Sequence, residues 1–360
     1  MPRFAFHGPY RHRISSFLAL NRIAIATYLR RLAGHRIAPD WTADQEIGVM
    51  FWRRQFTKAM RHPDRDTGRA ILDSLQTETD DIYAVTSRPN TAPIGDWHIP
   101  NRRVGTATIL YLHGGGLAFH GKISLRFAQM LCHHTGAPLF APDYRLTPEH
   151  KHPAQIDDAL SAWHYLSQQT DPGKIVLIGD SAGGYLALML MQKLRDLGLP
   201  QPALTIGLCP WTDIGNRGAS LQGNDRYDLV QGWMALKFGD WLDAPGVPRR
   251  TELSPISYGF AGLAPLYLQT GGRENLHDMI VDFAQRQAQA GADVMLDAWP
   301  GMVHDFQLLD GTIADAQQAN ARIAQAVRWA VDGGDALASQ GQTRLATGRF
   351  RAPGTQGCER

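Results

Sequence analysis

The sequence predicts an α/β fold with a mostly parallel central sheet flanked by helices. Short runs rich in apolar and β-branched residues alternate with helical stretches through most of the chain. The runs are continuous rather than alternating in polarity, as expected of strands that are buried on both faces. Strands and helices that alternate in this way are typical of parallel sheets.

The predicted strands are short apolar runs bounded by polar or glycine-rich segments. They lie at Thr106–Leu112, Pro138–Ala141, Lys174–Ile178, Ala203–Leu208, Pro265–Thr270 and Asp293–Ala298. Three of the segments between or after them have helical periodicity, and Pro153 can open the first. Their apolar positions are Ile156, Leu160, Trp163 and Leu166 in the first, Leu186, Leu190 and Leu194 in the second, and Leu276, Ile280, Phe283 and Ala288 in the third.

Two regions break this alternation. Residues 1–100 are mainly helical and loop-like, and residues 212–262 are rich in Trp, Asp, Gly and Pro and too long for an ordinary connection. Long insertions near the carboxyl ends of parallel strands often form lids or substrate pockets. We therefore predict that both regions contribute to one helical cap over a catalytic domain of residues 101–335. Residues 336–360 have few apolar side chains and are predicted to be a flexible tail.

The composition describes a soluble globular protein. Of the 360 residues 44% are hydrophobic and 19% are charged, and the net charge is +2. This weak net charge gives no reason to expect a nucleic acid partner, and no apolar run approaches the roughly 20 residues of a membrane span. Three distant cysteines, Cys132, Cys209 and Cys358, fit neither a disulfide framework nor a zinc site and suggest a reducing, cytoplasmic location. The oligomeric state stays open, a homodimer included.

The first forty residues are unusually basic, since seven arginines precede Asp40, the first acidic residue. Asn21 and Arg22 interrupt the apolar stretch of this segment, which argues against a signal peptide. The other interpretations are an organelle transit peptide, a basic amphipathic helix that contacts a membrane or covers an active site, and a surface helix packed on the main domain. We favour the packed surface helix.

The strongest local signal is Gly179-Asp180-Ser181-Ala182-Gly183, which is followed by Gly184. It lies between a predicted strand and a predicted helix. A serine on such a sharp turn exposes its hydroxyl above the edge of the sheet, and the glycines allow strand and helix to approach closely. The context therefore favours a nucleophilic serine over an ordinary helix N-cap.

A second signal, His113-Gly114-Gly115-Gly116, directly follows the first of the predicted strands. Three glycines let the backbone turn its N–H groups toward one point, where they can stabilise the oxyanion of a tetrahedral intermediate. We predict that the oxyanion hole consists of the amides of Gly115, Gly116 and Ala182. His113, with Gly114, is expected to organise this loop through hydrogen bonds. A flexible turn is the alternative, and a phosphate loop is disfavoured because its spacing is absent.

A serine hydroxyl needs a general base. His304 follows the last of the predicted strands, in the order serine, acid, histidine. The acid must hold the imidazole in the correct tautomer and stabilise its protonated form. Glu274, in the loop after the strand Pro265–Thr270, is the first choice. Asp278, in the following helix, is the second choice, and Asp305 ranks third because adjacent side chains usually point apart.

These motifs give the chain a clear resemblance to the hormone-sensitive-lipase-like family of α/β-hydrolase carboxylesterases. The resemblance also rests on the stretch from Asp143 to Asp158 and on Pro210–Asp213, and it covers about residues 104–310. It implies an α/β-hydrolase fold with a helical cap. It assigns the nucleophile to Ser181, the acid to Glu274, the histidine to His304 and the oxyanion amides to Gly115, Gly116 and Ala182.

The chain departs from the family pattern at three positions. Glu274 stands where Asp is commoner, Asp305 replaces the usual glycine after the histidine, and Leu117 replaces a frequent aromatic residue. The change at Asp305 is expected to shift His304 toward its charged form and to affect the pH optimum. The change at Leu117 is expected to alter the substrate pocket.

The residues together predict a serine hydrolase that acts on short- to medium-chain acyl esters through an acyl-enzyme intermediate. We expect its partner to be a small-molecule ester, with no metal or organic cofactor. A lactonase or amide hydrolase would use the same residues, and a lipase acting at an oil–water interface is a further alternative. A small-molecule receptor is disfavoured because serine, histidine and acid are all retained.

Overall fold

The computed structural model describes residues 4–77, 82–243, 250–334 and 337–351. Nine strands form the main sheet, in the order β11-β10-β9-β8-β7-β5-β6-β4-β3, and β1 pairs with β2 in a small separate sheet. The strands are β1 Phe4–Phe6, β2 Leu75–Thr77, β3 Val85–Thr91, β4 Ile94–Pro100, β5 Thr108–Leu112, β6 Leu139–Pro142, β7 Ile175–Asp180, β8 Leu204–Leu208, β9 Leu266–Gly271, β10 Val294–Trp299 and β11 Thr343–Ala346. The strands from β10 through β6 are parallel, and β11, β4 and β3 are antiparallel additions at the two edges.

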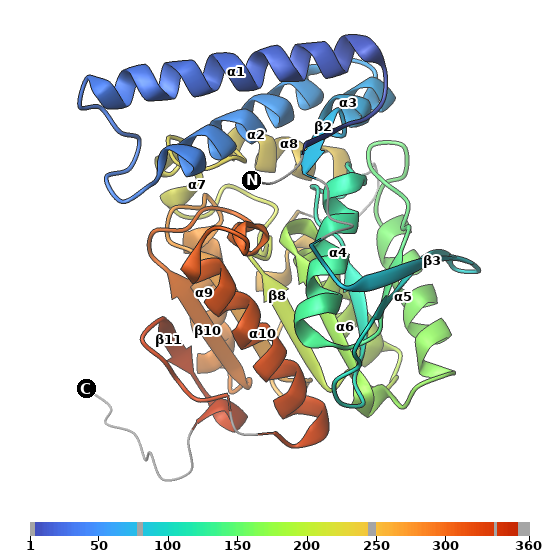
Figure 1. The fold of residues 1–360 in the computed structure, drawn as a ribbon. Coiled ribbons are helices and arrows are strands. Elements are labelled where there is room, and N and C mark those ends of the chain that lie inside the picture. Colours follow the sequence, from blue (N-terminus) through green and yellow to red (C-terminus); the bar gives the residue numbers. More distant parts are fainter. Residues whose placement is uncertain (1–3, 78–81, 244–249, 335–336, 352–360) are drawn as a thin grey trace.

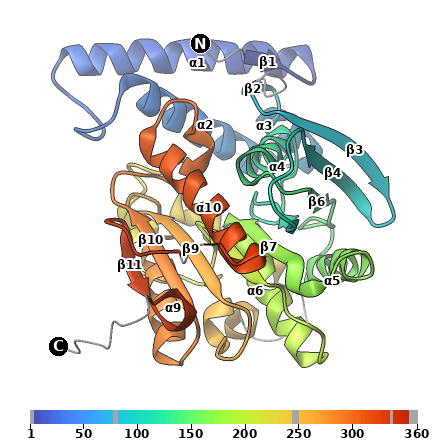
Figure 2. The same ribbon diagram turned by 60° about the horizontal axis from the view of Figure 1, so that its bottom comes forward.

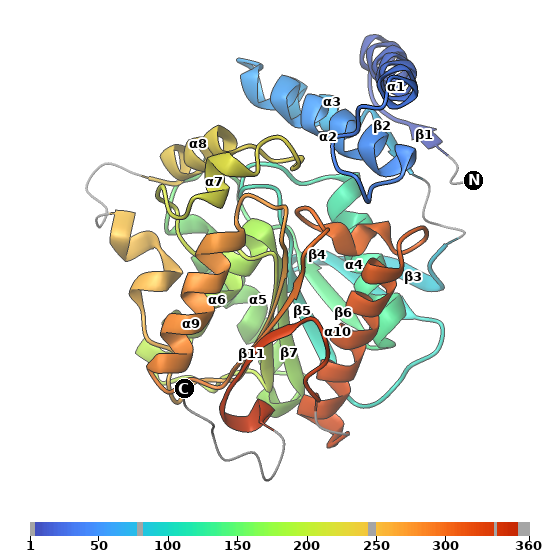
Figure 3. The same ribbon diagram turned by 90° about the vertical axis from the view of Figure 1, so that its left-hand side faces the viewer.

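Helices cover both faces of this sheet. In Figure 3, α5, α6 and α9 lie on one side of the strands and α4 and α10 on the other. The α-helices are α1 Tyr10–Leu32, α2 Ala43–Arg61, α3 Arg65–Leu72, α4 Lys122–Thr135, α5 Ala154–Ser167, α6 Ser181–Asp196, α7 Ser220–Gly223, α8 Gly232–Leu242, α9 His277–Gln289 and α10 Ala314–Asp332. Five short 3-10 helices occupy Pro172–Lys174, Arg250–Leu253, Pro255–Ser257, Phe306–Leu309 and Gly348–Phe350.

Each central strand contributes to two hydrophobic cores. In β5 and β7, Leu110 and Leu177 pack with residues of α5 and α6, whereas Ile109 and Val176 pack with residues of α4 and α10. All of these side chains are fully buried. The continuous apolar runs of the sequence therefore reflect burial on both faces. All six predicted strands and all three predicted helices are present, with ends shifted by a few residues.

The prediction that residues 1–100 are mainly helical and loop-like is wrong for residues 85–100. Residues 85–100 form the hairpin of β3 and β4, and β4 pairs antiparallel with β6 at the edge of the main sheet. Figure 2 shows this hairpin at one edge of the sheet and β11 at the other. Most side chains of β3 are exposed, so its sequence, with Pro89 and Asn90, has neither an apolar run nor a strict alternation. The pairing with β6 comes from tertiary contacts that the local pattern does not contain.

The prediction of a flexible tail at residues 336–360 is also wrong for residues 337–351, the part that the structure describes. Strand β11 pairs with β10, and Thr343 Oγ1 donates a hydrogen bond to Asp297 at 2.6 Å. Phe350 is buried against Trp329 of α10, with ring centroids 4.7 Å apart. The strand is short and polar, so it is recognisable only through these partners. Residues 352–360, including Cys358, lie outside the described residues.

The first three helices and the part of the insertion that contains α7 and α8 lie over the same end of the sheet, the end at which the parallel strands finish (Figure 1). Residues 250–262 of the insertion lie beside α6 instead, where Gln192 and Arg195 donate hydrogen bonds to the backbone carbonyl of Gly259. A direct contact joins the helices to the insertion: Arg53 of α2 donates hydrogen bonds at 2.8 and 2.6 Å to the backbone carbonyl of Asp228. The insertion contains α7, α8 and two of the 3-10 helices, and its residues 244–249 lie outside the described residues. Over the described parts of the chain, we find no helix that combines the length and the hydropathy needed to cross a membrane.

Candidate active site

Ser181 stands at the turn between β7 and α6. Its backbone has a φ of +51°, a left-handed conformation that is rare for a residue with a side chain. The turn requires glycine at position 183, because a Cβ there would collide with the backbone carbonyl of Leu112 in β5. Helix α6 starts at Ser181, so its unpaired N-terminal amides and positive dipole end lie beside the hydroxyl.

The glycine-rich loop after β5 lies next to this turn. Gly115 and Gly116 have φ values of +97° and +65°, which favour glycine. A Cβ at either position would also collide, with the carbonyl of Phe119 and the ring of Phe238 respectively. Gly115, Gly116, Ser181 and Ala182 line one cavity, so the three residues whose amides are predicted to form the oxyanion hole share a cavity with the serine.

His113 lies beneath this loop and does not reach the serine. Its ring is stacked between His120 and Tyr144, with centroid distances of 4.3 and 4.2 Å, and its Nδ1 lies 2.7 Å from the carbonyl oxygen of Gly114. Burial lowers the pKa of His113 well below its ordinary value, so the ring is neutral and Nδ1–H donates this bond. The ring is thus hydrogen-bonded within the glycine-rich loop, and its organising role stays a prediction.

Asp180 holds the same loop from the other side, a role that the sequence motif did not reveal. Its Oδ1 accepts hydrogen bonds from the backbone N–H of Gly114 at 2.8 Å and from the hydroxyl of Tyr111 at 2.7 Å. Burial raises the pKa of Asp180 to about 6. The carboxyl next to Ser181 thus links the turn between β7 and α6 to the glycine-rich loop.

Three predicted side chains form one chain of hydrogen bonds. His304 Nε2 lies 2.8 Å from Ser181 Oγ, and His304 Nδ1 lies 2.7 Å from Glu274 Oε2. The other carboxylate oxygen of Glu274 accepts hydrogen bonds from Thr270 Oγ1 at 2.6 Å and from the backbone N–H of Gly271 at 2.9 Å. Both Glu274 and His304 are almost fully buried. The geometry is that of a nucleophile, a general base and an orienting acid.

Asp278, the second-choice acid, has a different function. Its carboxylate accepts the backbone N–H of Ser220 at 2.9 Å, and its own backbone N–H bonds to the Ser220 hydroxyl at 3.0 Å. These hydrogen bonds of Asp278 therefore connect α7 to the start of α9. The structure does not bring it to His304.

Asp305 lies closer to the site than its sequence position suggests. Its Oδ2 is 3.5 Å from His304 Nε2, the nitrogen that faces the serine. The expectation that adjacent side chains point apart is wrong here, because Asp305 has a φ of +54° and this left-handed turn brings its side chain back to the histidine. Asp305 also lines the cavity that contains Ser181 and a larger neighbouring cavity.

Asp228, from the insertion, is a further buried carboxylate that sequence reasoning missed. It accepts the backbone N–H groups of Leu229 at 2.7 Å, of His304 at 3.1 Å and of Asn275 at 2.8 Å. It thus connects the insertion to the loops that carry the histidine and the acid. Burial and the neighbouring Glu274 raise the pKa of Asp228 to about 7. No signal in the sequence marks this residue, because it lies in a long loop without periodicity.

The carboxyl groups around His304 control its charge. Burial by itself lowers the pKa of His304, but Asp305, Glu274 and Asp228 outweigh this effect and raise it above its ordinary value. Burial and the other carboxyl groups also raise the pKa of Asp305, which therefore shares protons with His304. The site favours the imidazolium form more strongly than a Glu–His pair alone would.

One group of side chains in the described residues has the composition of a metal site. Ligand atoms of Cys209, His304 and Asp305 lie within 4.8 Å of one another. However, burial and the adjacent carboxyl groups raise the pKa of the Cys209 thiol well above its ordinary value. A thiol must lose its proton to bind a metal ion, and both ring nitrogens of His304 already have partners. These residues do not favour metal binding.

One cavity is lined by Ser181, and a second cavity beside it shares Gly115, His304 and Asp305 with the first. The smaller, of about 40 Å³, has apolar walls that include Trp211, Phe238 and Leu276. The larger, of about 160 Å³, extends from His304 and Asp305 along α2, where Val49, Trp52 and Phe56 line it. Leu117, expected to alter the substrate pocket, is buried in the core and is not among the residues that line either cavity, whereas Phe119 lines the larger one.

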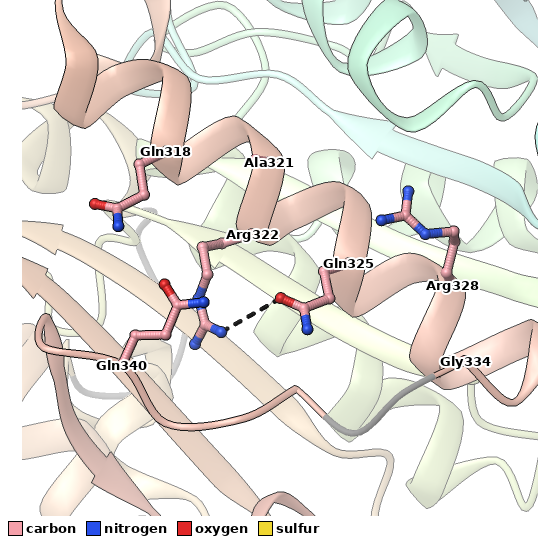
Figure 4. A pocket seen from close by; sticks show the side chains of 7 residues that line it. All are labelled: Gln318, Ala321, Arg322, Gln325, Arg328, Gly334 and Gln340. Atoms are coloured by element: carbon pink, nitrogen blue, oxygen red, sulfur yellow. Dashed lines mark hydrogen bonds between the residues drawn. The ribbon is translucent and has the colours of Figure 1, made fainter.

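A wider depression lies elsewhere, along α10 (Figure 4). It has a volume of about 520 Å³ and is lined by polar side chains such as Gln318, Gln325 and Arg328. The guanidinium group of Arg322 is held there by Asp297 at 2.9 Å and by the carbonyl of Ala338 at 2.7 Å. None of the described residues that line this depression is a serine, cysteine, histidine or carboxylate. The side chains predicted to be catalytic lie at the cavity around Ser181 instead.

Comparison with known proteins agrees with this geometry. The family described as alpha/beta hydrolase fold matches residues 109–308 of the chain, a span that contains Ser181, Glu274 and His304. The chain belongs to the alpha/beta hydrolase fold family. The main sheet, parallel except at its edges and flanked by helices, confirms the fold class that the sequence predicts.

Relatives of this hydrolase extend the comparison beyond the matched domain. An ethyl acetate hydrolase of Pseudomonas putida is 30% identical over 84% of this chain and 97% of its own length. An acetyl-hydrolase of Streptomyces hygroscopicus is 34% identical over 62% of this chain and 76% of its own length.

Solved structures are similar as well. A hormone-sensitive lipase from a metagenome library has a TM-score of 0.68 and 27% identity, over 78% of this chain and 98% of its own. An esterase from the bacterial hormone-sensitive lipase family has a TM-score of 0.66 and 26% identity, over 87% of this chain and 98% of its own. These similarities confirm the resemblance to the hormone-sensitive-lipase-like family.

Proposed function

We propose that this hydrolase is a serine carboxylesterase that cleaves short- to medium-chain acyl esters through Ser181, His304 and Glu274. The observation that carries the proposal is the unbroken chain of hydrogen bonds from the Ser181 hydroxyl through His304 to Glu274. Gly115, Gly116 and Ala182, whose amides we assign to the oxyanion hole, line the same cavity as Ser181 and His304. Relatives named ethyl acetate hydrolase and acetyl-hydrolase support ester hydrolysis as the activity.

In the proposed mechanism, neutral His304 accepts the proton of Ser181 through Nε2 as the oxygen attacks the ester carbonyl. Glu274 holds the other ring nitrogen and stabilises the imidazolium that forms. The backbone amides stabilise the oxyanion. His304 then gives the proton to the departing alcohol, and a water molecule activated in the same way releases the acyl group.

The size of the cavities supports a short acyl chain. The cavity of about 40 Å³ adjoins both the serine and the oxyanion amides, so we assign the acyl group to it. The larger apolar cavity along α2 is left for the alcohol. A lactonase or amide hydrolase would use the same catalytic residues, and the choice among them depends on the substrate.

A series of p-nitrophenyl esters from acetate to dodecanoate tests the proposal. We expect kcat/KM to peak at an acyl chain of about two to six carbons, because longer chains exceed the small cavity. Simple γ-lactones and p-nitroanilides of the same acids complete the panel. A rate that rises steadily toward dodecanoate, or lactones or anilides that react faster than the matched esters, would contradict the assignment.

Phe238 is expected to limit the acyl length. Its ring forms a wall of the small cavity next to Gly116. Phe238→Ala should raise the hexanoate-to-acetate ratio of kcat/KM by about tenfold or more, because each methylene group admitted to an apolar pocket contributes roughly 1–3 kcal/mol. Trp241→Ala is the matched control, since Trp241 lies on the same helix and packs on Phe238 but does not line that cavity. An equal change in both variants would assign the effect to the helix rather than to the cavity wall.

Asp305 is expected to set the lower pH limit of activity. The mechanism requires a neutral His304, and the Asp305 carboxyl raises the pKa of His304. Asp305→Asn keeps the shape of the side chain and tolerates the left-handed backbone, but removes the charge. The acid limb of the pH profile of kcat/KM should therefore move to lower pH. Asp278→Asn should leave that limb in place, and an unmoved or upward-shifted limb in Asp305→Asn would refute the electrostatic role.

A further inference from the structure

Helix α1 presents most of its large apolar side chains to the outside of the protein. Six of them are more than half exposed, and Leu32 is 84% exposed. On an ideal helical projection they fall within about 120° of one another. We call them the apolar strip: Tyr10, Phe17, Ile25, Tyr28, Leu29 and Leu32.

The opposite side of α1, which packs on α2, has only small and polar residues at its fully buried positions, although the half-buried Leu20 and Ile23 also lie on this side. The buried positions are His12, Ser16, Ala19 and Thr27. Ser16 accepts a hydrogen bond from Gln55 of α2 at 2.9 Å. In Figure 3, where α1 is seen nearly end-on, α2 and α3 lie between it and the sheet. This pattern is the reverse of an ordinary surface helix, whose apolar stripe faces the protein.

Arginines lie along the apolar strip, without acidic neighbours in the helix. Helix α1 contains five arginines and no aspartate or glutamate. On the helical projection, Arg11 and Arg22 lie along one border of the strip and Arg13 lies beyond the other. All three are exposed. Arg31, in contrast, is neutralised by the buried Glu46 at 2.8 Å.

We infer that α1 docks this hydrolase on an anionic lipid bilayer, with the apolar strip among the acyl chains and the bordering arginines at the lipid phosphates. A helix with one apolar face and a cationic remainder is the form that lies in the plane of a membrane surface. Anionic lipids supply the charge complementary to the arginines. A second copy of the chain on the same strip would bring arginines against arginines, so the charge favours the bilayer over self-association.

The docking surface is connected to the active site through α2. One side of α2 holds α1, and another side lines the larger cavity with Val49, Trp52 and Phe56. A bilayer contacted by α1 would therefore lie on the same side of the protein as the cavity assigned to the alcohol group, with α1 and α2 between them. This inference concerns location and is independent of the proposed ester chemistry.

Sedimentation of the full-length protein with vesicles tests the inference. We expect it to bind phosphatidylcholine vesicles that contain phosphatidylglycerol, and to bind pure phosphatidylcholine vesicles at least about tenfold more weakly. The variant Ile25→Gln/Leu29→Gln/Leu32→Gln should lower binding to the anionic vesicles by about tenfold or more, because three apolar contacts with the acyl chains are lost. Arg11→Gln/Arg22→Gln should also lower it, as should an ionic strength of about 0.5 M.

The matched control is Ile94→Gln/Leu197→Gln, which removes two exposed apolar side chains outside α1 and should leave vesicle binding unchanged. The rate of p-nitrophenyl acetate hydrolysis without vesicles should be the same in all of these variants. A change in this rate would concern the folding of the variant or the proposed function, and not membrane docking. Absence of binding to the anionic vesicles would overturn the inference. So would a wild-type dimer that becomes a monomer in the triple variant, with no vesicle binding in either.

Discussion

Ser181→Ala should lower kcat/KM for p-nitrophenyl acetate by about 10⁴-fold or more. The substitution removes the only atom that, in the proposed mechanism, forms the bond to the acyl carbon. The oxyanion amides would remain, and such donors with substrate binding can sustain a small residual rate. Alanine has the same Cβ as serine, so the strain of the left-handed backbone at this position is unchanged and the fold is not expected to weaken. Steady-state kinetics and a thermal unfolding curve on the same preparation check both points.

His304→Ala provides the matched test, because the two side chains are expected to act as one unit. The loss in His304→Ala should be similar in size to that in Ser181→Ala, and the double variant should be no worse than either single variant. Losses that multiply in the double variant would mean that the serine and the histidine act independently. A wild-type rate in Ser181→Ala would exclude this serine as the nucleophile.

Glu274→Gln should lower kcat/KM by about 10³- to 10⁴-fold. The glutamate accepts the Nδ1–H bond of His304 at 2.7 Å and is itself held by Thr270 and Gly271. An amide of the same shape can donate to Nδ1, which stabilises the tautomer that carries its proton on the serine side. The imidazolium that forms during attack would also lose a buried counter-charge. The loss should appear in kcat, since the contact is needed most in the transition state.

Asp278→Asn is the control for that substitution. Asp278 lies four residues further along and was the other candidate for the acid, but its carboxylate bonds to the backbone of Ser220. Its replacement should change kcat/KM only a few-fold and lower the unfolding temperature slightly, since one hydrogen bond to a charged group is weakened. If Asp278→Asn lost as much activity as Glu274→Gln, the acid would be assigned wrongly.

The parts of the site that sequence reasoning located are those with strong local signals. Glycines mark the turn at Ser181 and the loop at Gly114–Gly116. These glycines are required because the backbone there either approaches another segment closely or has a positive φ. Glu274 could be placed ahead of Asp278 because it lies in a loop at the carboxyl end of a strand. His304 was identified by its order along the chain. In each case the buried strand before the motif is visible as a continuous apolar run.

The parts that could not be predicted depend on contacts between distant segments. Asp228 lies in an irregular insertion, and its three backbone partners are set by the tertiary fold. The side chain of Asp305 turns toward His304 because of one backbone angle, which no residue pattern reveals. The strands β3 and β11 are short or exposed, and they are defined by their pairing partners at the edges of the sheet.

Peptide mapping by mass spectrometry after treatment with a fluorophosphonate most directly tests the claim that Ser181 is a nucleophile activated by His304. Such a probe forms a stable phosphonyl adduct with an activated serine. The proposed mechanism predicts one adduct, on the peptide that contains Ser181, with labelling strongly slowed in His304→Ala and absent from Ser181→Ala. An adduct on another residue, accompanied by loss of activity in the wild-type enzyme, would contradict it.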